Sequence, residues 1–236
     1  MEYAALTDVG MKRHNNEDSY IVNETHEDKI FIVADGMGGH NAGEIASLEA
    51  CRIIESYILQ NEGDIDRILE DGVIKANRDI FVRSNENPAL NGMGTTIDAC
   101  IIKDGKLHVA HVGDSRVYII SKDEMRRITK DHSIVGMMLE EGSITEEEAR
   151  VHPQRNYITR AVGSAINVEV DIVTEDVHGG EWVLMCTDGL TNMIPKREMH
   201  SIITGAKNVN DGACELVRKA KENGGDDNIT VILLQV

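Results

Sequence analysis

The sequence contains little proline and no tract typical of a linker. Its three prolines are scattered through 236 residues, and it has neither a Ser/Gly-rich tract nor a low-complexity segment. Connections between domains are usually rich in such residues, so we expect a single domain over residues 1–236. No internal repeat is visible, which excludes a solenoid or propeller. The length and the 41% hydrophobic content are sufficient for a buried core.

Cysteine is also scarce. The four cysteines are far apart in apolar surroundings, and none forms a C-x-x-C pair: Cys51, Cys100, Cys186 and Cys214. A zinc site or a disulfide framework requires paired or regularly spaced cysteines. The sequence therefore predicts reduced, buried thiols.

Positive charge is the third deficit. Against 41 Asp and Glu there are only 24 Lys and Arg, which gives a formal net charge of -17. Nucleic acids and anionic membranes bind basic surfaces, so neither is expected as a partner. The sequence also lacks an apolar run of about 18 residues and an amino-terminal segment of the signal-peptide type. We expect a cytoplasmic protein, with some of its negative charge balanced by bound cations.

Runs rich in Val, Ile and Thr recur along the chain and predict a protein built on β-sheets. The short Gly- and Asp-containing turn near residues 103–106 predicts antiparallel hairpins rather than crossover connections. The predicted strands are residues 19–24, 29–36, 95–102, 106–113, 116–121, 168–175, 181–189 and 228–236.

Helical periodicity occupies residues 43–60, 64–84 and 211–223. Two consecutive helices between strands, and another before the last strand, favour an α+β fold with sheets packed face to face and helices outside. Residues 134–157, acidic in their middle, are predicted to form a helical excursion that could act as a flap.

Four predicted strands carry an aspartate at one end: Asp35, Asp114, Asp188 and Asp227. Any one of them could simply mark a turn. Two of the four continue as Asp-Gly after almost wholly apolar segments, and neighbouring strand ends could bring the carboxylates together. Such like charges repel unless cations lie among them. Ligand sets made only of oxygen select Mg²⁺ or Mn²⁺.

A charged segment near the amino terminus adds Arg13, Glu17 and Asp18 just before a predicted strand. Alone, it could be a solvated loop. Beside a metal cluster, the arginine could hold the non-reacting oxygens of a phosphate. Carboxylates, hard cations and one arginine together suit the transfer of a phosphoryl group to water.

The glycine-rich stretch at residues 36–43 does not match a nucleotide-binding loop. The pattern G-x-G-x-x-G from Gly36 meets Asn41 in place of its third glycine, and no Gly-Lys-Ser/Thr is present. No cysteine is followed at the required distance by the arginine of a cysteinyl-phosphate enzyme.

The chain resembles the metal-dependent Ser/Thr phosphatases of the protein phosphatase 2C family, and more closely the compact bacterial members. Eight blocks match in order over nearly the whole chain: "TDVGMKRHNNED", "VADGMGGHNAGE", "GMGTT", "VAHVGDSRVY", "KDHS", "ITRAVG", "CTDGLT" and "GGDDNITVILL". The resemblance implies a four-layer α/β/β/α sandwich, two mainly antiparallel sheets with helix pairs outside, and a centre of two Mn²⁺ or Mg²⁺ ions.

The resemblance also implies a role for each site residue. Asp35 bridges both metals and the carbonyl of Gly36 binds one of them. Arg13 binds the phosphate. The remaining implied ligands are Asp188 and Asp227 for the first metal, Glu17 and Asp18 around the second, and Asp114 with Asp188 for a third, weaker metal.

One position departs from many animal members, which have a histidine directly after the Asp-Gly pair. Here Met37 follows, and the histidine comes at His40. His40 is therefore a candidate acid for the leaving group, the alternatives being a structural histidine or a metal-bound water as proton donor. The other histidines, including His132, are expected to be structural.

The expected activity is hydrolysis of phosphoserine and phosphothreonine by direct attack of a hydroxide shared by two cations. The expected partners are phosphorylated proteins, shared with a Ser/Thr protein kinase, and the chain is expected to be a monomer. The alternative from another class is a catalytically silent adaptor that binds phosphoproteins; loss of metal ligands would mark it, and Asp35, Asp188 and Asp227 are present.

Overall fold

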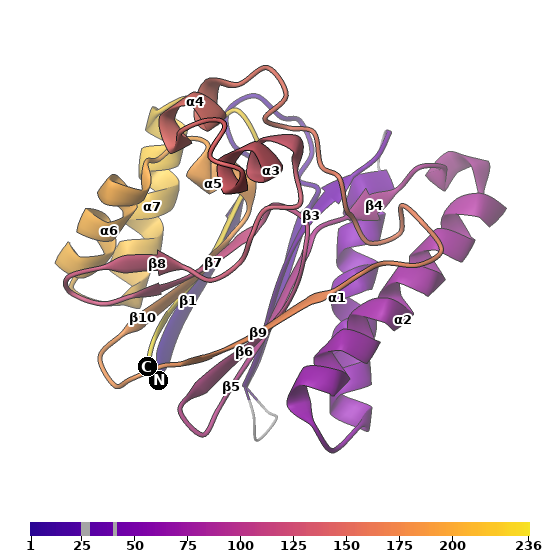
Figure 1. Cartoon of the computed structure of the whole chain (residues 1–236), viewed down its shortest axis with the longest axis horizontal. Coiled ribbons are helices and arrows are strands. Elements are labelled where there is room, and N and C mark those ends of the chain that lie inside the picture. Colours follow the sequence, from indigo (N-terminus) through magenta and orange to yellow (C-terminus); the bar gives the residue numbers. More distant parts are fainter. Residues whose placement is uncertain (25–28, 40–41) are drawn as a thin grey trace.

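The protein forms two β-sheets packed face to face between two layers of helices (Figure 1). A computed structural model describes residues 1–24, 29–39 and 42–236. The α+β sandwich expected from the sequence is confirmed. Within the described ranges, no helix is both long and apolar enough to cross a membrane.

The first sheet has five antiparallel strands, and both ends of the chain contribute to it. Its strand order is β1 (Glu2–Asp8), β11 (Ile229–Gln235), β10 (Trp182–Cys186), β7 (Arg116–Ile120) and β8 (Met125–Arg127). The sequence did not predict β1 or β8. Both are edge strands, and in β1 only Ala4 is fully buried, so the apolar alternation that signals a strand is weak there.

The second sheet is also antiparallel throughout. Its order is β2 (Asp18–Asn23), β3 (Lys29–Met37), β5 (Ile97–Lys103), β6 (Lys106–Val112) and β9 (Asp171–Asp176), with the short β4 (Gly94–Thr95) also paired to β3. Strand β9 begins three residues later than predicted.

Strand β3 shows why the central strands are apolar along their whole length. Phe31 and Val33 belong to the core between the two sheets, whereas Ile30 and Ile32 belong to the core under the helices. Successive side chains point to opposite faces of a strand, and here both faces are covered. The run therefore stays apolar until Asp35.

Helices α1 (Ala42–Gln60) and α2 (Ile65–Glu86) cover the second sheet, and α6 (Lys196–Gly205) and α7 (Val209–Glu222) cover the first (Figure 1). A short 3-10 helix, η1 (Pro88–Leu90), follows α2. The side chain of Asp64 caps α2 by accepting a hydrogen bond from the Arg67 amide.

One expectation about an individual side chain was wrong. Cys214 was expected to be buried with the other thiols but is exposed on α7. The core face of α7 includes the neighbouring Ala213, and one residue further along a helix turns the side chain about 100° away from that face.

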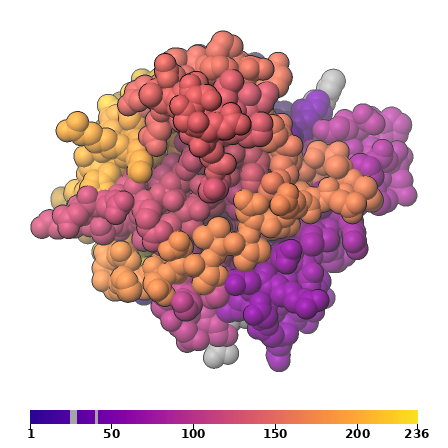
Figure 2. Space-filling view, viewed as in Figure 1, coloured from indigo at the N-terminus to yellow at the C-terminus, as the bar shows by residue number. Residues whose placement is uncertain are grey.

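Residues 134–157 form a helical excursion over one end of the sandwich (Figure 1). It contains α3 (Ile134–Glu140), capped by Ser133, and α4 (Glu146–Val151), which begins with a Thr145–Glu148 capping box. The chain returns where Ile158 pairs with Ser133. We call residues 134–157 the flap. The segment that follows it runs across the same face of the molecule towards β9 (Figure 2).

Candidate metal and phosphate site

The strand ends converge at one edge of the sandwich. Asp35 lies near the end of β3, Asp114 follows β6, Asp188 follows β10 as the first residue of α5 (Asp188–Thr191), and Asp227 precedes β11. They line one cavity of about 210 Å³, together with Arg13, Glu17 and Gly36. Strands from both sheets therefore contribute carboxylates to a single site, as expected when neighbouring strands end at one edge.

Asp18 lies behind this cavity. It is directly opposite Asp35 in the register between β2 and β3 and is only 7% exposed. The hydroxyls of Thr187 and Thr230 donate to its Oδ2 at 2.9 and 2.7 Å, whereas its Oδ1 has no hydrogen-bond partner. Burial raises the pKa of Asp18 to about 7, with the charges of Asp188 and Asp227 acting in the same direction.

Two neighbouring threonines hold the backbone of Asp35 in place. The Asp35 amide donates to the Thr96 hydroxyl at 2.9 Å, and the Thr95 hydroxyl and Thr96 amide both donate to the Asp35 carbonyl at 2.9 Å. Thr96 in turn contacts the Ser115 hydroxyl at 2.8 Å. These contacts fix the position of the Asp35 backbone near the end of β3, and they do not involve its carboxylate.

Gly36 is required by close packing rather than by an unusual backbone angle. A Cβ atom at this position would lie 2.1 Å from the Gly43 carbonyl oxygen and 2.5 Å from that of Glu17. The Gly36 amide also donates to the Glu17 carbonyl at 3.1 Å. The amino-terminal loop, β3 and the start of α1 thus meet at this glycine, which brings Glu17 to the site.

Mutual repulsion in a buried setting raises the pKa values of the clustered carboxyls. The pKa of Asp35 lies well above its usual value because of burial and then the charges of Asp18, Asp188 and Asp114. Burial likewise raises the pKa of Asp114, and it raises that of Asp188 to about 6. Without compensating positive charge, the cluster is unfavourable at neutral pH.

This donor set fits hard divalent cations. It contains carboxylate and carbonyl oxygens, and buried oxygens of Asp18, Asp114 and Asp188 have no hydrogen-bond partner. Among the described residues, no three His, Cys, Asp or Glu side chains already form a closed ligand set around one point. The fit therefore rests on the chemistry and burial of the oxygens, which suit Mg²⁺ or Mn²⁺.

Arg13 lies at the rim of the cavity and pairs with the Asp227 carboxylate, with 2.8 Å between Nη2 and Oδ2. Burial lowers the pKa of this guanidinium, but the carboxylate of Asp227 outweighs that effect and raises it overall. The adjacent Lys12 pairs instead with Asp226 at 2.6 Å. Arg13 is thus the cation that faces the carboxylate cluster.

Sequence reasoning missed Asn228, which ties the amino-terminal loop to the site. Its Oδ1 accepts from the Glu17 amide at 2.8 Å, and its Nδ2 donates to the carbonyls of Val9 and Asn15 at 3.0 and 2.9 Å. Its position directly after Asp227 was the only signal in the sequence. The other predicted site residue, His40, lies outside the described residues.

The raised carboxyl pKa values predict that stability depends on both pH and metal. From about pH 5 to 7 the unfolded chain has already lost the aspartate protons that folded Asp18 and Asp188 retain, so the metal-free protein loses stability as pH rises, by up to about 1.4 kcal/mol per pH unit for each group. Mn²⁺ should reverse this loss. Melting temperatures from pH 5 to 8, with and without Mn²⁺, measure both effects.

Asp18→Asn provides the matched variant for this experiment. It keeps an acceptor for Thr187 and Thr230 but cannot ionise, so the metal-free variant should show a flatter pH dependence than the wild type. A metal-free wild-type melting temperature that rises steadily over this pH interval would contradict the assignment.

Comparison with known proteins identifies the family. The model of the family described as Protein phosphatase 2C matches residues 6–229. The chain is 40% identical over 235 residues to the Serine/threonine phosphatase stp of Listeria innocua, which covers 97% of this chain and 93% of that protein.

Solved structures show the same likeness. The Serine/threonine phosphatase Stp1 of Staphylococcus aureus superposes with a TM-score of 0.94 at 32% identity, covering 100% of this chain and 94% of that one. The catalytic domain of the serine/threonine protein phosphatase PstP was solved in complex with two manganese ions. It superposes with a TM-score of 0.88 at 33% identity, covering 98% of this chain and 96% of that one. The chain therefore belongs to the protein phosphatase 2C family.

Proposed function

We propose that this chain is a metal-dependent phosphatase that hydrolyses phosphoserine and phosphothreonine in proteins. The observation that carries the proposal is the cavity in which strand-end carboxylates from both sheets face one arginine. The family relationship and the named activities of the relatives support it. Phosphoryl transfer to water needs metal ligands, a phosphate-binding group and little else from the protein.

The residues assigned to the metals are those that the sequence nominated. Asp35 would bind two ions and the Gly36 carbonyl one of them, and Asp188 and Asp227 would complete the first. Around the second ion we assign Glu17 and Asp18, and for a third, weaker one Asp114 with Asp188. Divalent cations at these positions supply Lewis acidity and lower the pKa of water towards about 7. Which of the two ions, Mn²⁺ or Mg²⁺, occupies the site in the cell depends on their availability as well as on these ligands.

The side chains themselves bind and orient the substrate. Arg13 stays charged and donates from one nitrogen to Asp227, which leaves other guanidinium N–H groups for the phosphoryl oxygens. His40 is the proposed donor of the proton that the departing serine oxygen requires. Asn228 holds the loop that carries Glu17, so it is a positioning residue.

The proposed setting follows from this activity. The substrates are phosphorylated proteins, which a Ser/Thr protein kinase would supply, and the enzyme acts as a cytoplasmic monomer. Its formal charge of -17 argues against nucleic acid as a partner.

Phosphate release from a phosphoserine peptide tests the proposal. We expect release with Mn²⁺ and none with excess chelator, and little release from a matched phosphotyrosine peptide. Binding of the phosphoserine peptide without any metal-dependent release would instead identify a catalytically silent adaptor.

Arg13→Ala tests the phosphate site, with Lys12→Ala as its neighbouring control. Loss of the Arg13 fork should raise KM for p-nitrophenyl phosphate about tenfold and lower kcat less, because the arginine binds the phosphate before and during reaction. Lys12 pairs with Asp226 outside the cavity, so its loss should change KM less than about twofold. An unchanged KM in Arg13→Ala would remove Arg13 from the phosphate site.

A further inference from the structure

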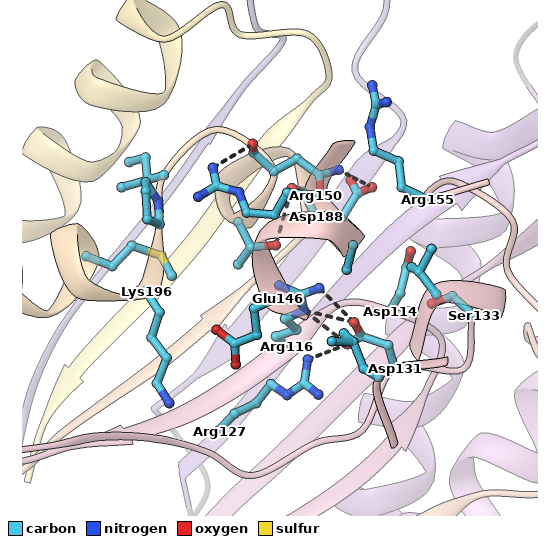
Figure 3. Close-up of a pocket in the computed structure, with 18 of the residues that line it drawn as sticks. Asp114, Arg116, Arg127, Asp131, Ser133, Glu146, Arg150, Arg155, Asp188 and Lys196 are labelled. Carbon is cyan, nitrogen blue, oxygen red and sulfur yellow. Dashed lines mark hydrogen bonds and ion pairs between the residues drawn. The ribbon is translucent and has the colours of Figure 1, made fainter. Parts of the chain in front are cut away.

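A second cavity lies beside the metal and phosphate site, between the flap and helices α5 and α6 (Figure 3). Its volume is about 80 Å³. Asp114 and Asp188 line both cavities, so the two spaces share a wall. The second cavity opens where Glu146, Pro195 and Lys196 are exposed.

The second cavity is rich in positive charge, although the chain as a whole has a formal charge of -17. Apart from the shared wall, the acidic residues that line it among those described are Asp131 and Glu146. The cationic residues that line it are Arg116, Arg127, Arg150, Arg155 and Lys196.

Asp131 neutralises only part of this charge. Arg116 donates to both of its carboxylate oxygens, and Arg127 donates to Oδ1 at 3.2 Å. These arginines hold the pKa of Asp131 below its usual value despite burial. Two guanidiniums thus share this carboxylate, and Arg116 also lowers the pKa values of Asp114 and Asp188 in the shared wall, against the effect of burial.

Arg150 and Lys196 add further positive charge to this lining. Arg150 donates to the carbonyl oxygen of Asn192 at 3.1 Å, and within the described residues neither Arg150 nor Lys196 forms an ion pair. Lys196 also begins α6, whose first turn has no side-chain cap. Figure 3 shows Arg150 and Lys196 on the same side of the cavity, with Glu146 between them and Arg127.

We propose that this second cavity binds a second anionic group, a phosphate monoester or a carboxylate, on the same peptide that presents its phosphoserine to the carboxylate site. Unpaired Arg and Lys groups in a partly enclosed space are the usual ligands of such anions. The proposal rests on the proposed function and defines a substrate class: segments with a second phosphorylated or acidic residue near the reacting one.

The shared wall makes simultaneous binding by one peptide feasible. An extended chain advances about 3.3 Å per residue, so residues two to four positions away span about 7–13 Å. When the second anion is moved through these positions, the ratio of kcat/KM values, doubly over singly anionic peptide, should be largest at one spacing and on one side of the reacting phosphoserine.

The test compares a phosphoserine peptide with the same peptide carrying a second phosphoserine or a glutamate. The measured quantity is the ratio of initial kcat/KM values, doubly over singly anionic. In the wild type we expect a ratio of about ten or more at low salt that falls as salt screens the contact. Lys196→Glu should reduce the ratio towards one, and Glu146→Gln should increase it.

Lys207→Glu is the matched control. It makes the same charge change on an exposed lysine just beyond the other end of α6, about 15 Å along the helix axis, and should keep the wild-type ratio. A wild-type ratio of one, or equal ratios in Lys196→Glu and Lys207→Glu, would overturn the proposal.

Two further outcomes keep the alternatives separate. If inorganic phosphate inhibits the wild type and Lys196→Glu differently while the peptide ratio stays at one, the cavity takes free phosphate and the peptide assignment is wrong. Failure of the singly phosphorylated peptide to react at all would reject the proposed function instead. For each variant, kcat/KM for the doubly anionic peptide is divided by kcat/KM for the singly anionic peptide. A general loss of activity therefore leaves this ratio unchanged.

Discussion

Asp35→Asn should lower Mn²⁺-dependent turnover by roughly a thousandfold, the largest effect that we expect from any single substitution. The side chain keeps its shape and the backbone amide of residue 35 still donates to the Thr96 hydroxyl, but the charge that would be shared between two cations is lost. Removing one preorganised electrostatic contact already costs about a hundredfold to a thousandfold in kcat. Phosphate release from a phosphoserine peptide over a range of Mn²⁺ concentrations measures the loss.

The same variant should be more stable than the wild type when metal is absent. It replaces a carboxyl group whose ionised form is disfavoured by burial and by neighbouring carboxylates, among them Asp18 directly opposite, with a group that cannot ionise. Asp8→Asn is the control, because Asp8 also ends a strand but pairs with Lys221 at 2.7 Å. Asp35→Asn with more than a tenth of wild-type turnover would exclude the bridging role.

Gly36→Ala should destabilise the protein by about 3 kcal/mol and remove most of its activity. The new methyl group would meet the carbonyls of Gly43 and Glu17 at 2.1 and 2.5 Å, and backbone atoms cannot move aside as a flexible side chain can. Inserting one group into a tightly packed region typically costs about 1–3 kcal/mol, and the contacts here are with backbone. Urea unfolding of the metal-free variant measures the change.

Gly39→Ala gives a control in the same loop. A Cβ atom at Gly39 has no neighbour within 4 Å, so this variant should unfold within about 0.5 kcal/mol of the wild type. Equal stabilities for the Gly36 and Gly39 variants would show that β3 and α1 can separate without cost, and that Gly36 is not held by packing.

The central elements of the fold could be predicted because their signals are local. Strand β3 is apolar along its length since both faces are covered, and α1 and α2 follow helical periodicity over long segments. Edge strands and short helices carry weaker signals. Strand β1 buries a single residue fully, and α6 buries only Met199 and Ile203, so neither was identified from its pattern.

The residues of the candidate site could be nominated from their place at strand ends, but their environment could not. The sequence indicated Asp18 as one member of a charged loop. The structure shows it directly opposite Asp35 and hydrogen-bonded to Thr187, which follows β10, and to Thr230 of β11, with a pKa raised to about 7. The two threonine contacts join residues that are 169 and 212 positions apart, so the local sequence around Asp18 does not indicate them.

The sequence by itself determined that carboxylates, a glycine and one arginine stand at strand ends and in the ordered motifs of the protein phosphatase 2C family, because such motifs are local in the chain. Only the tertiary structure decided which charges are left unbalanced. The folded chain places Arg150 and Lys196 in the lining of the same cavity as Asp188, and neither forms an ion pair with a described residue, although the protein is strongly acidic overall. Electrostatic interactions act through space over a few ångströms, so net charge and spacing along the chain do not specify the charge inside a cavity.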